Sequence, residues 1–460
     1  MKPETRNPKS KSRSAKSEPL PPRTVFGFRI SDFGFRTSTT LLTATLLLSL
    51  LSSPASDNWP RWRGPRDNGT AAPGAYPVRW DATNHILWRA PLPGKGCSTP
   101  AVWGERIFVT APVKGQDAVL CISDAGKPLW QKPLGSERTA KHKNASGSNP
   151  SAVTDGKGVF VYFKSGDFAG FDLDGTVRWQ TNLVERFGPD TLFWDYGNSP
   201  VLTELHVIIT LMHHGESWLA AFDKTTGELR WKVSRNYVTP TEGDNSYATP
   251  IVIQHQGQPA LLVWGATHLT AQSAEDGRVL WDCGGFNPEA KPYWPSVASP
   301  VVCGDFAVIP YGRGNVLHGV KLGGSGDVTS THRTWDRTDT GAYTPTPAAS
   351  GGQVFLLRDE GELLCVDPAT GKTLWSGAFP RSSNKFYASP VVADGKIYSA
   401  REDGVVFVTK AEGPFQLLSV NILDDRLIAS PVPVNNRLLL RGEKALYCIS
   451  ETATAPAPGQ

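Results

Sequence analysis

The stretch Leu363-Leu-Cys-Val-Asp-Pro-Ala-Thr-Gly-Lys-Thr-Leu-Trp375, together with Ala388-Ser-Pro-Val-Val-Ala-Asp-Gly-Lys-Ile-Tyr398, decides the fold. It predicts an apolar strand, an Asp-x-x-Thr-Gly turn, a strand that ends in Trp, a loop, and two more strands after Ser-Pro. Units of this kind recur along most of the chain. Internal repeats of about 40 to 50 residues are typical of propellers, solenoids and other arrays.

A Ser-Pro, Thr-Pro or Asn-Pro dipeptide marks the start of each unit. Eight of them precede β-branched runs, at Thr99-Pro100, Asn149-Pro150, Ser199-Pro200, Thr249-Pro250, Ser299-Pro300, Thr346-Pro347, Ser389-Pro390 and Ser430-Pro431. Their spacings are 50, 50, 50, 50, 47, 43 and 41 residues. A Trp closes most units, at Trp130, Trp179, Trp231, Trp281, Trp335 and Trp375. The chain is therefore predicted to contain eight structural units.

Each unit has room for four short strands, and no long window has a helical period. A four-stranded sheet cannot bury both of its faces alone, whereas sheets stacked radially cover one another. The prediction is an all-β fold, an eight-bladed β-propeller of four-stranded antiparallel blades. The last unit, from Ser430 to Ser450, lacks its Trp strand, and an unassigned strand, His85-Ile-Leu-Trp88-Arg-Ala90, precedes the first unit. We expect this N-terminal strand to complete the eighth blade and close the ring.

Residues 1–55 have the pattern of a secretory signal. A basic region, the apolar run Leu41–Leu51 and the small residues Ser53-Pro-Ala55 predict cleavage after Ala55. The run is too short to span a bilayer, so no integral membrane segment is expected after cleavage. A periplasmic or extracellular protein is predicted, although a start codon placed too early would also explain the long basic region. The other predicted divisions are a Trp/Gly/Pro-rich lead-in (56–84), the propeller (85–451) and a disordered tail (452–460).

The charge balance argues against nucleic acid as a partner. The whole chain has 47 Lys and Arg residues against 43 Asp and Glu. Nine of the basic and three of the acidic residues lie within residues 1–55, which leaves 38 against 40 in the exported part. Because the basic excess belongs to the leader, no attraction to nucleic acid or to an anionic membrane is expected. We expect a single-domain monomer.

The six cysteines are an even number, which in an exported protein would suggest disulfides. The repeat favours another role. Cys121, Cys365 and Cys448 occupy matching strand positions, where the third unit has an alanine, so we expect them to be buried small apolar residues. Cys283 and Cys303 do not occupy this repeated strand position, and a disulfide bridge between them remains an alternative.

Propeller geometry separates the loops into two faces. With strands A to D running from axis to rim, D–A connections and B–C turns share one face, and A–B and C–D turns share the other. The C–D turns repeat Asp and Gly, as in Asp367-Pro-Ala-Thr-Gly371, which predicts a structural role. The D–A and B–C loops vary and are rich in aromatic and polar residues, the pattern of a binding site on a constant scaffold.

This variable face is the predicted docking site for a protein partner or a small polar ligand. Its candidate residues are Lys143, Asn144, Trp194, Asp195, Tyr196, Asn198, His213, Asp244, Asn245, Tyr247, Trp294, Arg313, Lys385, Tyr387 and Arg401. For each aromatic residue the alternative is packing between blades.

No motif identifies a catalytic or metal site. His213-His-Gly-Glu216 contains metal-ligand residue types, but adjacent positions on an extended strand point to opposite faces, and no metal is expected there. Asp195 and Asp244 lie one unit apart and could form the carboxylate pair of a glycosidase. We assign no catalytic residue and expect no cofactor.

The repeat Leu-x-Ala/Cys-x-Asp-x-x-Thr-Gly-x-x-Leu-Trp, followed by Ser-Pro-Val-Val-x-x-Gly-x-Ile-Tyr/Phe, resembles the pyrroloquinoline-quinone (PQQ)-like propeller repeat over residues 85–450. The resemblance implies an eight-bladed ring and two kinds of relative. The quinoprotein alcohol dehydrogenases bind PQQ with calcium on the propeller axis. The propeller lipoprotein of the bacterial outer-membrane barrel-assembly machinery is not an enzyme and works through protein contacts.

The dehydrogenases carry a disulfide between adjacent cysteines, and this chain has no adjacent cysteines. We therefore expect an exported, non-catalytic binding or assembly scaffold. The alternative is a PQQ-dependent alcohol or sugar dehydrogenase that uses Asp195, Asn198, Asp244 or Asn245 around the axis, with calcium.

Overall fold

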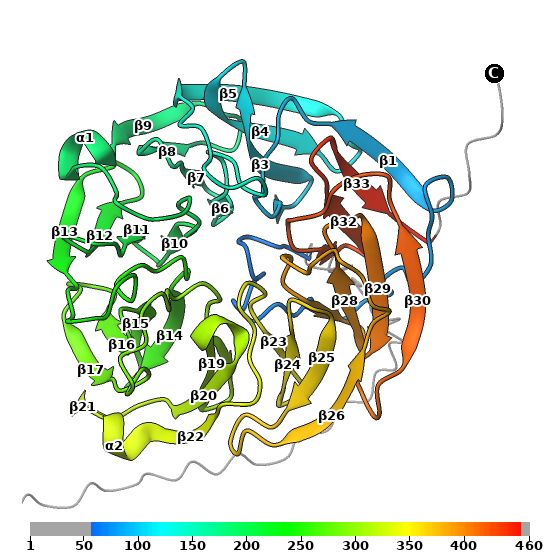
Figure 1. Cartoon of the computed structure of the whole chain (residues 1–460). Helices are drawn as coiled ribbons and strands as arrows, with labels where there is room; N and C mark the ends of the chain where they lie inside the picture. Colours follow the sequence, from blue (N-terminus) through cyan, green and yellow to red (C-terminus); the bar gives the residue numbers. More distant parts are fainter. Residues whose placement is uncertain (1–56, 452–460) are drawn as a thin grey trace, which may run out of the picture. The chain divides into compact units, whose positions relative to one another are not determined.

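The computed structural model describes residues 57–451, so the predicted leader and tail lie outside the described residues. Eight antiparallel sheets surround one central axis (Figure 1). Seven sheets have four strands, and the fourth blade gains a fifth, two-residue strand that pairs in parallel at its outer edge. The predicted eight-bladed propeller is confirmed. None of the helices in the described part of the chain is long and apolar enough to cross a membrane.

The first four blades follow one another along the chain. Blade 1 consists of β2 (Ala101–Trp103), β3 (Arg106–Val113), β4 (Gln116–Ser123) and β5 (Pro128–Ser136). Blade 2 consists of β6 (Val153–Thr154), β7 (Val159–Tyr162), β8 (Asp167–Phe171) and β9 (Val177–Asn182). Blade 3 consists of β10 (Val201–Leu202), β11 (His206–Leu211), β12 (Trp218–Asp223) and β13 (Leu229–Ser234). Blade 4 consists of β14 (Ile251–His255), β15 (Gln258–Gly265), β16 (His268–Ser273), β17 (Val279–Cys283) and β21 (Gly326–Asp327).

The remaining blades complete the circle. Blade 5 consists of β18 (Val301–Cys303), β19 (Phe306–Tyr311), β20 (Val316–Lys321) and β22 (Arg333–Arg337). Blade 6 consists of β23 (Ala348–Ser350), β24 (Gln353–Leu357), β25 (Glu362–Val366) and β26 (Thr373–Ala378). Blade 7 consists of β27 (Val391–Ala393), β28 (Lys396–Ala400), β29 (Val405–Lys410) and β30 (Leu417–Ile422). The short helices are α1 (Leu183–Phe187), α2 (Thr329–His332) and the 3-10 turn η1 (Gly312–Gly314).

Blade 8 joins the two ends of the described chain. It consists of β31 (Val432–Val434), β32 (Arg437–Arg441), β33 (Ala445–Ile449) and the N-terminal strand β1 (Ile86–Pro91). β1 pairs antiparallel with β33, and Trp88 lies opposite Cys448. The predicted closure of the ring by the N-terminal strand is therefore confirmed.

In several blades the repeated Trp contacts the next blade, and the indole N–H groups of Trp130, Trp179 and Trp335 donate to its C–D turn. In blade 1, Trp130 lies opposite Cys121, a small residue on the neighbouring strand. Its indole N–H donates a hydrogen bond to the carbonyl oxygen of Leu173 in the C–D turn of blade 2 (3.0 Å), and a Cβ on Gly175 would lie 2.8 Å from its ring. A side chain at the turn glycine would therefore displace the Trp.

The cysteines behave as small packing residues. Cys121, Cys365 and Cys448 are fully buried, as expected. All six cysteines lie in the described part of the chain and all are free thiols, so the alternative of a Cys283–Cys303 bridge is not realised.

A ring of hydroxyl groups surrounds the axis, and each accepts a hydrogen bond from the backbone N–H of the preceding blade. In order, the N–H donors and hydroxyl acceptors are Thr99 to Ser151 (2.9 Å), Ser151 to Ser199 (3.0 Å), Ser199 to Thr249 (3.0 Å), Thr249 to Ser299 (2.9 Å), Ser299 to Thr346 (2.9 Å), Thr346 to Ser389 (3.0 Å), Ser389 to Ser430 (3.2 Å) and Ser430 to Thr99 (3.2 Å). In blade 2 the hydroxyl comes from Ser151 rather than from the anchor Asn149. We call these eight groups the hydroxyl ring.

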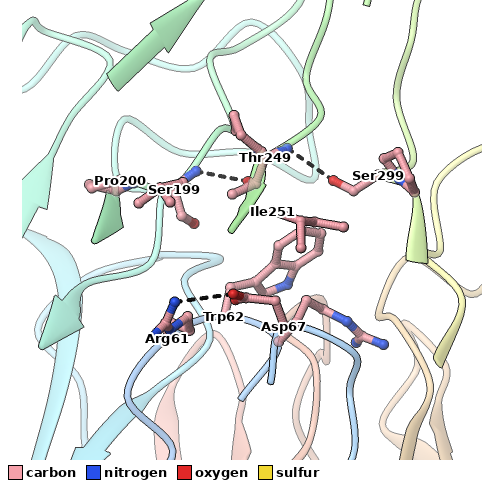
Figure 2. Close-up of a pocket in the computed structure, with 12 residues that line it drawn as sticks. Arg61, Trp62, Asp67, Ser199, Pro200, Thr249, Ile251 and Ser299 are labelled. Carbon is pink, nitrogen blue, oxygen red and sulfur yellow. Dashed lines mark hydrogen bonds and ion pairs between the residues drawn. The ribbon is translucent and has the colours of Figure 1, made fainter. Parts of the chain in front are cut away.

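The lead-in crosses the face that carries the A–B turns, which we call the lower face. Trp59 forms a β-bridge with Val102 of blade 1, and Thr70 forms one with Val392 of blade 7. Between them, Trp62 lies at the axis, with its indole beside Ile251 (Figure 2). The lead-in therefore covers the lower end of the axis before β1 closes the ring.

Candidate functional site

The face opposite the lead-in, which we call the upper face, contains a cavity of about 770 Å³. Its wall comes from D–A connections, such as the one with Trp194, and from B–C turns, such as the one with Arg358. These are the two loop classes that were predicted to share a face. The cavity shares lining residues, including Cys97 and Tyr387, with a channel of about 170 Å³ on the axis below it. The upper cavity and the channel are therefore continuous.

Aromatic side chains supply much of the wall of the upper cavity. Trp194, Tyr247, Tyr343 and Tyr387 all line it. Trp194 is partly exposed and its ring packs edge-on against His142, with ring centroids 5.2 Å apart. Such surfaces offer flat apolar contact with a polar edge, which suits a planar group or a peptide side chain.

Asp195, the central carboxylate of the sequence prediction, forms a buried ion pair with Lys164 at the edge of the cavity. Both oxygens also accept backbone hydrogen bonds, from the N–H of Lys141 (2.9 and 3.0 Å) and, for Oδ2, from that of His142 (2.9 Å). Burial alone would raise the pKa of Asp195, but the bonds from Lys164, His142 and Lys141 lower it overall. This carboxylate holds two loops together in its ionised form.

Two further charges in the wall are also paired. The Lys385 ammonium lies 3.2 Å from a Glu360 oxygen, and Arg358 donates to Glu362 (2.9 Å). Arg313 differs from them. It donates to the carbonyl oxygen of Tyr293 (2.9 Å) and lies 5.2 Å from the centroid of the Tyr343 ring, and it forms no ion pair within the described residues.

Asp359 completes the charged groups of the wall. Its two oxygens accept the backbone N–H groups of Tyr343 (2.8 Å) and Thr344 (3.1 Å). Burial raises its pKa, and these hydrogen bonds oppose the rise only in part. With Asp195, Glu360 and Lys385 paired, Arg313 is the cation best placed to meet an anionic group of a ligand.

The structure brings about half of the predicted site residues together. Those that line the upper cavity are Asn144, Trp194, Asp195, Tyr247, Arg313, Lys385 and Tyr387. Lys143 lines a neighbouring groove of about 620 Å³ on the same face. The predicted residues that line neither the upper cavity nor this groove are Tyr196, Asn198, His213, Asp244, Asn245, Trp294 and Arg401.

Several of these other residues have structural partners. The Tyr196 hydroxyl donates to the Thr210 carbonyl oxygen (2.8 Å), and Arg401 holds Asp403 with two hydrogen bonds of 2.9 Å. His213 accepts from the Thr191 N–H at Nδ1 (3.0 Å) and lies 3.0 Å from the Glu216 carbonyl oxygen at Nε2. Trp294 packs against Tyr311 (ring centroids 5.5 Å apart).

Cavity residues outside the selected set include Cys97, His142, Tyr343, Arg358, Asp359 and Ile428. His142, Tyr343, Arg358 and Asp359 belong to the D–A and B–C loops that the sequence assigned to this face. Cys97 precedes the first repeat anchor, and its place below the cavity follows only from ring closure.

The donor set does not fit a quinone with calcium. Calcium needs several carboxylate or carbonyl oxygens around one point. Asp195 is already neutralised by Lys164, whereas Asp244 lies against His214 (3.1 Å) outside the cavity lining. Asn198 is buried and donates to Thr210 Oγ1 (3.1 Å). Among the described residues no cluster of His, Cys, Asp and Glu side chains could hold a metal ion.

Comparison with known proteins supports the expected resemblance. The family model described as outer membrane protein assembly factor BamB matches residues 74–210 and 324–413. The outer membrane protein assembly factor BamB of Yersinia pestis is 24% identical over 352 residues, which cover 74% of this chain and 70% of that protein.

Solved structures show the same fold. The crystal structure of BamB from Moraxella catarrhalis matches with a TM-score of 0.57 and 15% identity, over 79% of this chain and 99% of that one. The quinohemoprotein alcohol dehydrogenase of Comamonas testosteroni matches with a TM-score of 0.60 and 12% identity, over 89% of this chain and 83% of that one. The chain is thus similar in fold to both kinds of PQQ-like propeller, and its sequence is similar to that of the assembly factor.

Proposed function

We propose that this protein is an exported, non-catalytic binding and assembly scaffold, which acts as a monomer and holds a segment of a protein partner in the upper cavity. One observation carries the proposal: the cavity combines four aromatic side chains with Arg313, while its carboxylates are held by other groups of the protein. Such a site is suited to binding, because Asp195 and Glu360 are held in ion pairs and Asp359 is held by backbone N–H groups.

The similarity to outer membrane protein assembly factors supports an assembly role, because that relative matches across most of both chains. A periplasmic or outer-membrane-associated location is part of the same proposal. The partner segment that best fits the cavity carries an aromatic group to pack beside Tyr387 and Trp194, and an acidic group to reach Arg313.

The alternative function, a PQQ-dependent dehydrogenase, draws support from the dehydrogenases of similar fold. It would require calcium to displace Lys164 from Asp195, at a large cost because both side chains are buried. Isothermal titration of the protein with PQQ, with and without calcium, tests this alternative directly. Calcium-dependent binding at one site with micromolar affinity would overturn the scaffold proposal.

Site-specific photo-crosslinking in the exporting cells tests the scaffold proposal itself. A photoreactive phenylalanine analogue replaces Tyr343 or Tyr387 in the cavity, and the matched control replaces Thr225, an exposed residue of a C–D turn on the lower face. We expect one recurrent crosslinked partner from the two cavity positions and none from Thr225. Crosslinks of equal yield from both faces would contradict the proposal.

A second variant adds a chemical control. Arg313→Glu reverses the charge of the one cation in the cavity wall that lacks an ion pair. If an acidic partner segment docks there, the crosslink from Tyr387 should fall at least tenfold. An unchanged crosslink would show that the partner does not use this charge.

A further inference from the structure

The axial channel below the upper cavity is lined by hydrogen-bond donors that have nothing to donate to. Each hydroxyl of the ring accepts one backbone N–H, and none donates to another group within residues 57–451. Most are nearly fully buried; Thr99 and Ser299, for example, are 2% exposed. Buried polar groups almost always find partners, so eight free hydroxyl protons around one axis point to a bound species.

The lining of the channel selects the chemistry of that species. Seven members of the hydroxyl ring (all but Ser299) line it together with Trp62, Cys97, Asn149, Thr344 and aromatic and aliphatic groups, and among the described residues that line it there is no Asp or Glu. Each hydroxyl is also polarised by the N–H that donates to it, which strengthens its own donor. Donors without a neighbouring carboxylate favour a group that only accepts hydrogen bonds.

A buried positive charge lies beside the ring. The Arg63 guanidinium is 3% exposed, and its Nη2 donates to the carbonyl oxygens of Pro347 (3.0 Å) and Pro390 (2.9 Å). These prolines directly follow two ring members, Thr346 and Ser389. Arg63 Nε and Nη1 are buried without a hydrogen-bond partner in the described part of the chain.

Within residues 57–451 no carboxylate forms an ion pair with Arg63. Asp67, the acid whose charge acts on Arg63, is bound by Arg61 (3.1 Å), as Figure 2 shows. Burial lowers the pKa of Arg63 to about 9, which still leaves it charged at neutral pH. Asp67 also attracts Arg63, but this one carboxylate faces both Arg61 and Arg63, so the cluster of the three side chains carries one excess positive charge at the lower end of the axis.

Trp62 closes the channel from below. It lines both the channel and the small pocket beneath it. Figure 2 shows its indole below Ser199, Thr249 and Ser299, which are joined to one another by hydrogen bonds. The Arg63 guanidinium carbon lies 5.8 Å from the centroid of the Trp62 ring. Trp62 thus lies at the lower end of the channel, and the upper end shares lining residues with the upper cavity.

We propose that this axial channel is an anion site, in which the hydroxyl ring binds a halide or a small carboxylate such as formate and Arg63 supplies the counter-charge. The volume of about 170 Å³ admits such an ion with a few waters. The site is separate from partner binding in the upper cavity, so either proposal can fail without the other.

Anomalous diffraction from crystals of the full chain grown in sodium bromide tests the site. We expect a bromide peak in the channel within hydrogen-bond distance of at least three ring hydroxyls. Density for water alone in the channel would overturn the proposal.

Melting temperatures in solution distinguish the two classes of anion. Bromide, chloride and formate are titrated at constant ionic strength against gluconate, a much larger anion. Because an anion that binds only the folded state stabilises it, the melting temperature should rise with the concentration of a small anion and then level off. A rise with formate alone assigns the site to carboxylates, and a rise with halides alone assigns it to halides. Equal curves for all salts, gluconate included, would contradict a specific site.

Two variant pairs separate binding from folding. Arg63→Met removes the charge and Arg63→Lys keeps it, and we expect bromide affinity to fall at least tenfold for the first and less for the second. A second pair keeps the test independent of the folding of Arg63→Met: Thr249→Val is compared with Thr249→Ser, which keeps the hydroxyl. A severalfold loss of affinity for the Val variant alone supports the proposal, and equal affinity in both variants would refute it.

Discussion

The backbone N–H of Ser430 donates a hydrogen bond to Thr99 Oγ1 (3.2 Å), although 331 residues separate them in the sequence. This bond is the last of eight that pass around the axis, and it makes the first and last repeat anchors neighbours. Ring closure therefore depends on the axis, through the hydroxyl ring, as well as on the rim, through the pairing of β1 with β33.

Loss of one ring hydroxyl should destabilise the protein. Ser430→Ala removes the acceptor of the Ser389 N–H (3.2 Å) and leaves a buried donor without a partner, which costs about 1–3 kcal/mol. Urea unfolding monitored by tryptophan fluorescence measures the change. The control is Ser383→Ala, at an exposed serine nearby, where a change within about 0.5 kcal/mol is expected. Equal effects of the two substitutions would show that the ring bond contributes no stability.

A turn glycine under a repeated Trp should tolerate no side chain. A Cβ on Gly371 would lie 2.6 Å from the Trp335 ring, at a φ of +72°. Gly395 has a similar φ of +66°, but a Cβ there would meet nothing within 4 Å. Gly371→Ala should therefore cost about 1–3 kcal/mol more than Gly395→Ala, because only the first adds overpacking to backbone strain. The difference between the two urea midpoints measures this packing term, and a difference near zero would contradict it.

The Lys164–Asp195 pair should act as one unit. Lys164→Met leaves the buried Asp195 carboxylate without its partner, which costs about 3–5 kcal/mol. Adding Asp195→Leu to this variant should recover part of the loss, a non-additivity that a double-mutant cycle measures. As a control, Arg230→Met breaks an exposed pair with Asp223 and should cost less than about 1 kcal/mol. Additive effects at positions 164 and 195 would contradict the pairing.

Asp117 on β4 should make stability depend on pH. It is fully buried, and the Ser165 and Ser148 hydroxyls oppose the effect of burial on its pKa only in part. Burial raises its pKa to about 7, so the folded state holds a proton that the unfolded state releases from about pH 4. The contribution of Asp117 to the free energy of unfolding should therefore be largest below pH 4. It should fall by up to about 4 kcal/mol as the pH rises to about 7.

The substitution Asp117→Asn checks that assignment. It should leave stability near pH 4 little changed, raise it at pH 8, and flatten the decline between them. Free energies of unfolding at pH 4.5 and pH 8 measure the slope in the two proteins. An unchanged slope would assign the pH dependence to other groups.

The repeat was sufficient to predict the blades, because strand, turn and Trp spacings are local properties of the sequence. The Asp367 side chain illustrates this, since it accepts the N–H groups of Ala369 and Thr370 (3.0 and 2.9 Å) within its own turn. For the candidate site, the sequence predicted the face of the propeller on which it lies but not which side chains line the cavity. Trp194 and Tyr387 line the upper cavity, whereas Tyr196 and His213, which have the same residue chemistry, form hydrogen bonds to neighbouring backbone groups.

The sequence by itself determined the eight blades, the strand that closes the ring and the buried role of the cysteines, since all three follow from periodic patterns of neighbouring residues. The tertiary structure alone decided which polar groups meet. It paired Asp195 with Lys164, placed Trp62 and Arg63 at the axis, and joined seven repeat anchors and Ser151 into one ring of hydroxyls. The physical reason is that these contacts join residues tens to hundreds of positions apart. Their geometry is fixed by the closure of the ring and not by any local spacing.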